Sequence, residues 1–240
     1  MISRKPDQQP VRGIEPADLI VACDQMAADV ESLAADHRLF STLYDRNGLP
    51  PLWRRAPSFE TLVRFILEQQ VSLASANAAY GRLESRLSGV TPGGVLASTD
   101  SEMKIDGFSH QKTRYVRGIA DQIMSGELDP AALGGDPGVI MDRLLKIKGI
   151  GPWTASCFLV FVSGNRDTWP TGDRALYVSM AKNMDMTDVP DRESGDRIAS
   201  GWSPLRSTAA KMLWHDHLGG RTYMPNPDAG FIEGTGKVRL

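Results

Sequence analysis

The residues best suited to chemistry lie between positions 144 and 173. The stretch 144–155 (LLKIKGIGPWTA) carries Gly149 and Gly151 with one residue between them, and Asp173 follows about one helix and a loop later. Two glycines allow a tight turn with exposed backbone amides, and a helix that begins at Pro152 adds free amides of its own. Amides arranged in this way bind phosphate. The spacing therefore predicts a clamp for a nucleic-acid backbone, with a single carboxylate beside a nucleotide.

Candidate phosphate ligands surround this turn. They are backbone amides, one hydroxyl and one positively charged side chain, from Gly149, Gly151, Thr154 and Lys148. Lys112 and Arg206 lie elsewhere in the sequence, and each is either a further phosphate contact or an ordinary solvated charge. The formal net charge of −2 argues mildly against a nucleic-acid partner. A local basic strip is nevertheless enough to hold a few phosphates.

The composition excludes several classes of protein. No apolar run reaches the roughly 18 residues of a membrane span, and the N-terminus lacks the apolar segment of a secretion signal. The two cysteines, Cys23 and Cys157, cannot by themselves form a four-cysteine zinc or iron–sulfur site. Both lie among apolar neighbours, as reduced thiols of cytoplasmic proteins do. We therefore expect a cytoplasmic protein (nucleoid-associated in a bacterium) that requires no cofactor and does not bind membranes.

The hydrophobic pattern predicts an all-α fold. Apolar residues recur at helical spacing, and no stretch of any length alternates with the period of a strand. Asp136 precedes Pro137 as a candidate N-cap, and Gly164 follows a helix as a stop signal. The helices are predicted at 16–35, 38–44, 60–87, 110–125, 137–147, 152–163, from 173 onward, 191–201 and 203–219.

Gln69 interrupts the apolar stripe of the predicted helix 60–87. A glutamine on a buried stripe must find hydrogen-bond partners, because an unpaired buried amide lowers stability. Two roles satisfy this requirement from the sequence alone. Gln69 either ties two helices together or faces a cleft in which a ligand supplies the partner.

Five motifs in order along residues 30–218 resemble the helix-hairpin-helix DNA glycosylase superfamily, and the similarity is closest to the 3-methyladenine DNA glycosylase II branch. They are Ile66–Ser72 (ILEQQVS), Gly107–Thr113 (GFSHQKT), the hairpin Leu145–Ala155, Asp173 and Trp202–Ser207 (WSPLRS). The resemblance implies base flipping from damaged double-stranded DNA, followed by hydrolytic excision of an alkylated purine, by a monomeric enzyme. It also implies two helical subdomains with a cleft between them. The expected division is 13–58 with 174–220 for one, 59–173 for the other with the hairpin at 137–163, a flexible segment 1–12 and an irregular tail 221–240.

The resemblance assigns the catalytic role to Asp173. As the base leaves, positive charge builds on the sugar, and a fixed carboxylate either stabilises that charge or activates water. An aspartate at the start of a helix also serves as an N-cap, and one residue can do both. Members of the superfamily with lyase activity carry a lysine where this chain has Trp153. The resemblance therefore implies a monofunctional enzyme that forms no Schiff base.

The resemblance also suggests a base pocket and a DNA wedge. An alkylated purine is positively charged, so aromatic walls suit it. The expected pocket residues are Trp153, Trp169, Phe158 and Leu205, although Trp169 also fits a core position. Gln69 and Gln70 are candidates to fill the gap in the stack. Hairpins of this kind recruit a monovalent cation, Na+ or K+, and the carbonyls of Lys148 and Ile150 are candidate ligands.

Two other functions remain compatible with the sequence. One is a glycosylase for a different lesion, such as a deaminated or oxidised base, since the pocket residues decide the preference. The other is a non-catalytic DNA-binding module that kept the hairpin. The carboxylate of Asp173 argues against the second, because an acid near phosphates weakens simple binding.

Overall fold

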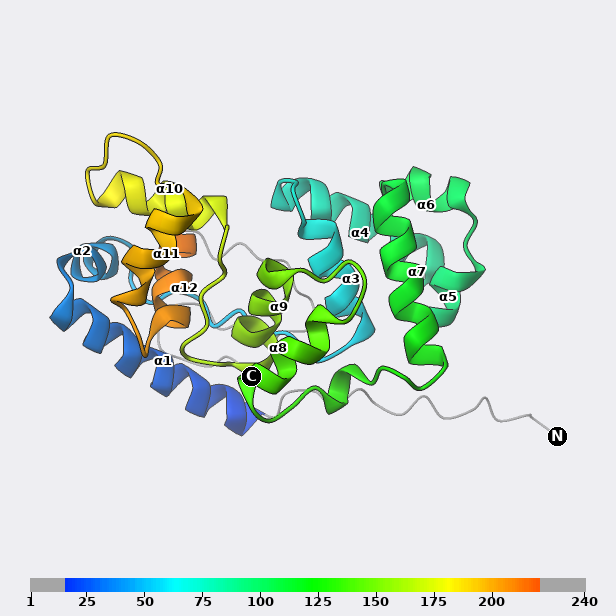
Figure 1. The fold of residues 1–240 in the computed structure, drawn as a ribbon, viewed down its shortest axis with the longest axis horizontal. Coiled ribbons are helices and arrows are strands. Elements are labelled where there is room, and N and C mark those ends of the chain that lie inside the picture. Colours follow the sequence, from blue (N-terminus) through cyan, green and yellow to red (C-terminus); the bar gives the residue numbers. More distant parts are fainter. Residues whose placement is uncertain (1–15, 221–240) are drawn as a thin grey trace.

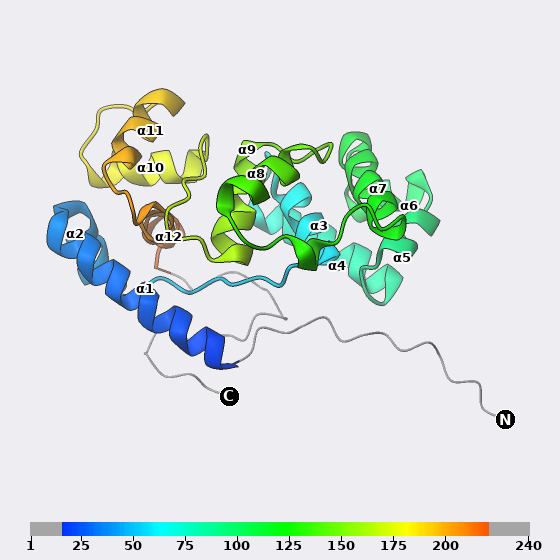
Figure 2. The same cartoon turned by 60° about the horizontal axis from the view of Figure 1, so that its bottom comes forward.

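The chain folds into two groups of helices that lie side by side (Figures 1 and 2). The computed structural model describes residues 16–220, in which all regular structure is helical and no strand occurs. The α-helices are α1 (Pro16–Asp36), α2 (Arg38–Asn47), α3 (Phe59–Glu68), α4 (Leu73–Leu87), α5 (Pro92–Ala97), α6 (Asp100–Asp106), α7 (His110–Met124), α8 (Pro137–Leu145), α9 (Pro152–Phe158), α10 (Arg174–Asn183), α11 (Arg192–Ser200) and α12 (Arg206–His217).

Helices α3 to α9 form the first lobe. Their apolar faces bury a continuous core that includes Phe65, Ile66, Leu83 and Val116. A 3₁₀ turn (η1, Pro130–Ala132) leads into α8, and α9 continues into a π-helical turn (η2, Leu159–Ser163) that adds Phe161 to the core. Burial of these faces is the main stabilisation, because short helices are marginal on their own.

Helices α1, α2, α10, α11 and α12 form the second lobe around a separate core. Phe40, Leu176, Met180 and Trp202 are buried there. Trp214 of α12 packs against both cores, and its ring stacks on Phe161 of the first lobe with centroids 5.2 Å apart. The chain crosses between the lobes at 48–58 and again at 164–173. The second crossing ends at Asp173.

Local capping signals position several of these helices. Asp136 accepts hydrogen bonds from the backbone N–H groups of Gly138 and Val139 at the start of α8, as predicted. Gly164 adopts φ +69° and ends the continuous helical segment formed by α9 and η2, also as predicted. The last turn is π-helical rather than α-helical, so its backbone hydrogen bonds span one more residue.

The predicted helix 60–87 is wrong in one respect, because it breaks at Gln69. Helix α3 ends at Glu68, Gln70 adopts a left-handed φ of +57°, and Ser72 caps α4 by accepting from the Ser75 N–H. The apolar stripe continues across the break, so periodicity alone could not reveal the turn. Helices α5 and α6 were not predicted, although Thr91 and Thr99 supply their N-caps.

Cys23 and Cys157 are both free thiols, and Cys157 is buried. No helix within the described residues is long and apolar enough to cross a membrane. The predictions for residues 1–12 and 221–240 lie outside the part of the chain that the structure describes.

Candidate functional site

Asp173 stands where the second crossing enters α10. Its Oδ1 accepts the Leu176 N–H at 3.1 Å, so it caps the helix as the sequence predicts. Its Oδ2 accepts the indole N–H of Trp153 at 2.8 Å. The residue is 8% exposed. A carboxylate has about four lone-pair sites, so two hydrogen bonds leave acceptor capacity for a water or a ligand.

Trp153 lies in the first turn of α9, directly after the hairpin. Its ring is half-buried and packs against the first core, while its N–H reaches the carboxylate at the start of α10. This hydrogen bond therefore joins the two lobes at the carboxylate. The geometry brings together the two residues that the resemblance placed at the reaction centre.

The hairpin between α8 and α9 is shaped by its two glycines. Gly149 has φ +99°, and a Cβ atom there would lie 2.3–2.8 Å from atoms of the Tyr115 side chain. Gly151 is the N-cap of α9, with φ −96° and no atom within 4 Å of a Cβ position. Gly149 is therefore required by the fold. The space beside Gly151 is open, as a phosphate clamp needs.

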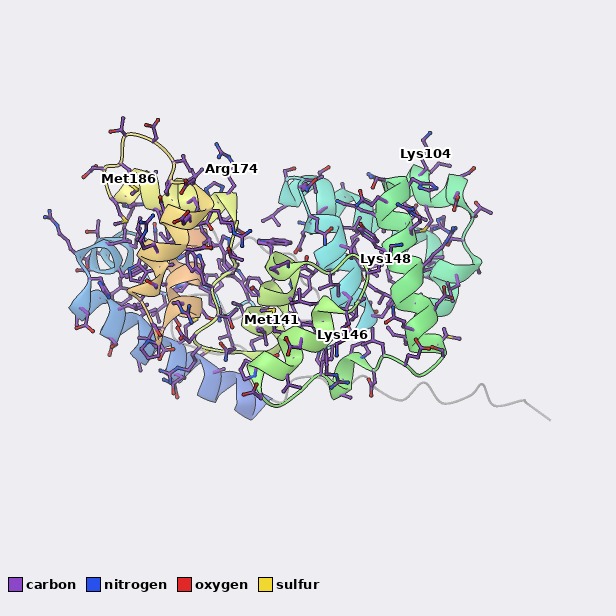
Figure 3. The ribbon with its side chains drawn as sticks, viewed as in Figure 1. Lys104, Met141, Lys146, Lys148, Arg174 and Met186 are labelled. Carbon is purple, nitrogen blue, oxygen red and sulfur yellow. The ribbon has the colours of Figure 1, made fainter. Side chains whose placement is uncertain are left out.

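Exposed cations lie on both lobes (Figure 3). Lys146 and Lys148 belong to the hairpin, and Arg174 directly follows Asp173 at the start of α10. Lys148 is a phosphate ligand predicted from the sequence, whereas Arg174 was not predicted. Its adjacency to Asp173 in sequence was the available signal.

Gln69 ties the end of α3 to the hairpin. Its side-chain amide donates to the Gly149 carbonyl and to the Thr154 hydroxyl oxygen, both at 2.9 Å. Of the two roles open from the sequence, the structure therefore shows the tie between elements. Thr154 is only 2% exposed. Its predicted role as a phosphate ligand is therefore corrected: the hydroxyl is a buried partner of Gln69.

The two distant cations also bind within the protein. Lys112 donates to the carbonyls of Leu67 and Gln69 at 2.7 and 2.9 Å, where it neutralises the carbonyl end of α3. Partial burial lowers the pKa of Lys112. Arg206 binds Asp167 through two nitrogens. Neither side chain is an ordinary solvated charge, and the structure gives both of them partners other than phosphate.

Three of the four expected pocket residues lie in hydrophobic cores. Phe158 is 1% exposed inside the first core, and Trp169 and Leu205 belong to the second. The Trp169 ring meets Trp202 edge to face, and its N–H donates to Asp196 at 2.9 Å. The expectation for Phe158 is corrected, because the first core encloses it, whereas Trp169 and Leu205 are each 8% exposed, as Asp173 is, and their place in a base pocket stays a prediction. Trp153 alone of the four combines partial exposure with contact to Asp173.

The turn between α3 and α4 exposes Gln70 and Val71. Gln70 adopts a left-handed backbone in this turn, directly after the end of α3. Because Gln69 is tied to the hairpin, the turn lies beside Gly149. Gln70 therefore keeps a place compatible with a wedge, whereas Gln69 faces inward.

Residues 16–220 contain no cluster of three or more His, Cys, Asp or Glu side chains that could hold a metal ion. The Gly149 carbonyl is engaged by Gln69. No backbone N–H within the described part of the chain donates to the carbonyls of Lys148 or Ile150. Those two oxygens fit the chemistry of a monovalent cation, which prefers uncharged carbonyl ligands.

The sequence of this chain is similar to those of known DNA repair proteins. Residues 63–236 match the sequence model of the HhH-GPD superfamily base excision DNA repair proteins. A putative DNA-3-methyladenine glycosylase, YfjP of Bacillus subtilis, is 25% identical over 186 residues, which are 72% of this chain and 64% of the relative. The chain thus spans somewhat less than two thirds of that relative's length.

Solved structures of DNA glycosylases share the fold. The 3-methyladenine DNA glycosylase Mag1 of Schizosaccharomyces pombe, solved with abasic DNA, superposes with a TM-score of 0.71 at 24% identity, over 78% of this chain and 95% of that chain. A DNA-3-methyladenine glycosidase of Bacillus halodurans gives 0.61 at 29% identity, over 80% and 88%. This chain belongs to the HhH-GPD superfamily of base excision DNA repair proteins.

Proposed function

We propose that the chain is a monofunctional DNA glycosylase that excises alkylated purines from double-stranded DNA. The observation that carries the proposal is the hydrogen bond from Trp153 to Asp173, which fixes a buried carboxylate beside the hairpin. The names of the similar proteins favour 3-methyladenine and related bases as substrates.

The carboxylate suits cleavage of an N-glycosidic bond. As the bond to the base breaks, positive charge develops on the sugar, and the negative charge of Asp173 stabilises it. The acceptor sites left on the carboxylate orient the water that then adds to C1′. An alkylated purine is a good leaving group because it already carries positive charge. The protein therefore needs to position the damaged nucleotide and to place one negative charge beside its sugar.

The hairpin holds the DNA backbone in this proposal. The free amides after Gly151 and the charge of exposed Lys148 bind a phosphate, and a cation on the Lys148 and Ile150 carbonyls strengthens the site. Arg174 binds a neighbouring phosphate. Gln70 and Val71 lie at the exposed turn, where a side chain can fill the gap left by a flipped base.

Trp153 supports two finer parts of the proposal, the preference for a cationic purine and the absence of lyase activity. Its partly exposed ring offers a π-face to a cationic purine. An indole cannot attack the sugar as an amine does, so we infer that the enzyme lacks lyase activity and forms no Schiff base. We also propose that it acts as a monomer, and size-exclusion chromatography with light scattering tests this.

A panel of duplexes tests the substrate class. The purified protein is incubated with DNA that carries 3-methyladenine, 7-methylguanine, hypoxanthine, uracil or 8-oxoguanine, and released bases are separated by chromatography. Release of the methylated purines, with no borohydride-trapped covalent complex, is the expected result. Release of only a deaminated or oxidised base would replace the substrate class. Binding without any release would indicate a non-catalytic module.

A further inference from the structure

Asp196 of α11 binds the segment that leads into Asp173. We propose that Asp196 is a positioning residue that holds the Asp173 carboxylate in place for base excision; this inference rests on the proposed function. Asp196 carries no direct contact to Asp173 in the structure. It acts through residues 169–172, which form the last part of the crossing between the lobes.

The Asp196 carboxylate gathers three donors. Its Oδ1 accepts the Trp169 indole N–H at 2.9 Å and the Tyr177 hydroxyl at 2.7 Å, and its Oδ2 accepts the Thr171 hydroxyl. Two donors belong to the segment, and Tyr177 belongs to α10. One side chain therefore fixes the segment against both α10 and α11.

Tyr177 extends this network to the residue next to Asp173. Its hydroxyl oxygen accepts the backbone N–H of Gly172 at 2.7 Å, while its hydrogen goes to Asp196. Burial and the bond to Asp196 raise the pKa of Tyr177, so the hydroxyl remains a donor at neutral pH. Hydrogen bonds to the side chains of Asp196 and Tyr177 thus hold residues 169, 171 and 172. The remaining residue of the segment, Pro170, has no N–H to donate.

Close packing of α11 against α10 places the Tyr177 ring beside Asp196. A Cβ atom at Gly195 would lie 2.5 Å from Cε1 of Tyr177, so a glycine beside Asp196 lets the ring approach. Tyr177 itself is buried in the second core. The ring is therefore closely packed, with its hydroxyl oxygen 2.7 Å from the Gly172 backbone nitrogen.

The segment needs such support. Gly172 has φ +80°, and no atom lies within 4 Å of a Cβ position there. Because glycine is conformationally permissive, its backbone can adopt other conformations when the bond to Tyr177 is lost. The Asp173 side chain would keep its bonds to Leu176 and Trp153, but the backbone bond from its N–H to the Pro170 carbonyl would then hold it to a segment that is itself less fixed. A displacement of about 1 Å in a catalytic group is enough to lower a rate by roughly a hundredfold.

Single-turnover base release tests the proposal. Asp196→Ala is expected to lower the rate at least tenfold, while affinity for an abasic duplex stays within twofold of wild type. Asp196→Asn should recover part of the rate, because its amide oxygen still accepts a hydrogen bond. Tyr177→Phe removes only the hydroxyl and should lower the rate in the same direction. Glu193→Gln, an exposed acid on the same helix, is the charge control and should match wild type.

A further control separates position from stability. Asp191→Ala removes the N-cap of α11 without touching the segment, so it should lower the melting temperature but leave the rate unchanged. If the wild type releases bases and both Asp196→Ala and Tyr177→Phe release them at the same rate, the positioning role of Asp196 is overturned while the proposed function stands. A wild type that releases no base from any duplex would overturn the proposed function, and the role of Asp196 with it.

Discussion

At the scale of single residues, Asp173 combines two roles that the sequence left as alternatives. One oxygen caps α10 and the other accepts the Trp153 N–H. The cap anchors the carboxylate to the second lobe, and the indole aligns it with the hairpin of the first. The residue is held on both sides, so it needs no reorganisation when charge develops on a sugar beside it.

Replacing Trp153 by phenylalanine isolates the indole N–H. The smaller ring still offers an aromatic face, but the Asp173 Oδ2 loses its donor. We expect single-turnover base release to fall roughly tenfold to a hundredfold, the scale expected when a catalytic group is misplaced by about 1 Å. Fluorescence anisotropy should show unchanged affinity for an abasic duplex. A rate within twofold of wild type would show that the bond does not position the carboxylate.

At the scale of elements, the hairpin is held from behind by two other helices. Gln69 at the end of α3 binds its Gly149 carbonyl, and Tyr115 of α7 packs against Gly149. Lys112, also on α7, binds the last carbonyls of α3. The phosphate clamp, the exposed turn at Gln70 and the end of α3 therefore form one connected unit.

Lys112→Met distinguishes a role inside the protein from a phosphate contact. The two lost hydrogen bonds of a charged donor should lower the free energy of unfolding by about 1–3 kcal/mol, measured by urea denaturation. The salt dependence of DNA binding should keep its slope. A slope reduced by about 1, as for the loss of one phosphate contact, would contradict the internal role.

The two hairpin glycines should respond differently to alanine. Gly151→Ala has room for its Cβ, so the fold should remain stable, but the methyl group crowds the amides and weakens binding several-fold on damaged and undamaged duplexes alike. Gly149→Ala requires a left-handed alanine against Tyr115 and should lose at least about 1 kcal/mol of stability. Anisotropy and thermal melts give the two readouts. Wild-type affinity in Gly151→Ala would exclude the clamp.

The comparison of sequence with structure explains which predictions were possible. The helix caps at Asp136 and Asp173 and the glycine turn depend on neighbours within a few residues, and all are confirmed. The places of Trp169, Phe158 and Leu205 in the cores depend on which face of an element meets a core, which spacing could not decide. The hydrogen-bond partners of Lys112 and Asp196 lie 19 to 45 residues away in the chain.

At the scale of the whole molecule, one buried carboxylate joins three helices of the second lobe. Asp216 of α12 accepts hydrogen bonds from Arg46 and Asn47 at the end of α2 and from Lys182 and Asn183 on α10. Burial alone would raise its pKa, but these donors outweigh burial and lower the pKa to about 2. The charged form of Asp216 therefore stabilises the lobe that carries Asp173.

This pKa predicts a pH dependence of stability. Because the folded pKa lies below that of the unfolded chain, the contribution is present above about pH 4 and is lost as pH falls toward 2. Asp216→Asn should be less stable than wild type at pH 7 by about 1–3 kcal/mol. Urea unfolding at several pH values should show this difference shrinking in acid. A constant difference would contradict the assignment.

The central claim is that the Asp173 carboxylate performs base excision, and Asp173→Asn tests it most directly. Asparagine caps a helix as well as aspartate, so the fold should be retained while the charge is lost. Single-turnover release of 7-methylguanine or 3-methyladenine should fall at least about a hundredfold. Affinity for the duplex should stay equal or become tighter, because a negative charge near phosphates is removed. Release at the wild-type rate would contradict the account.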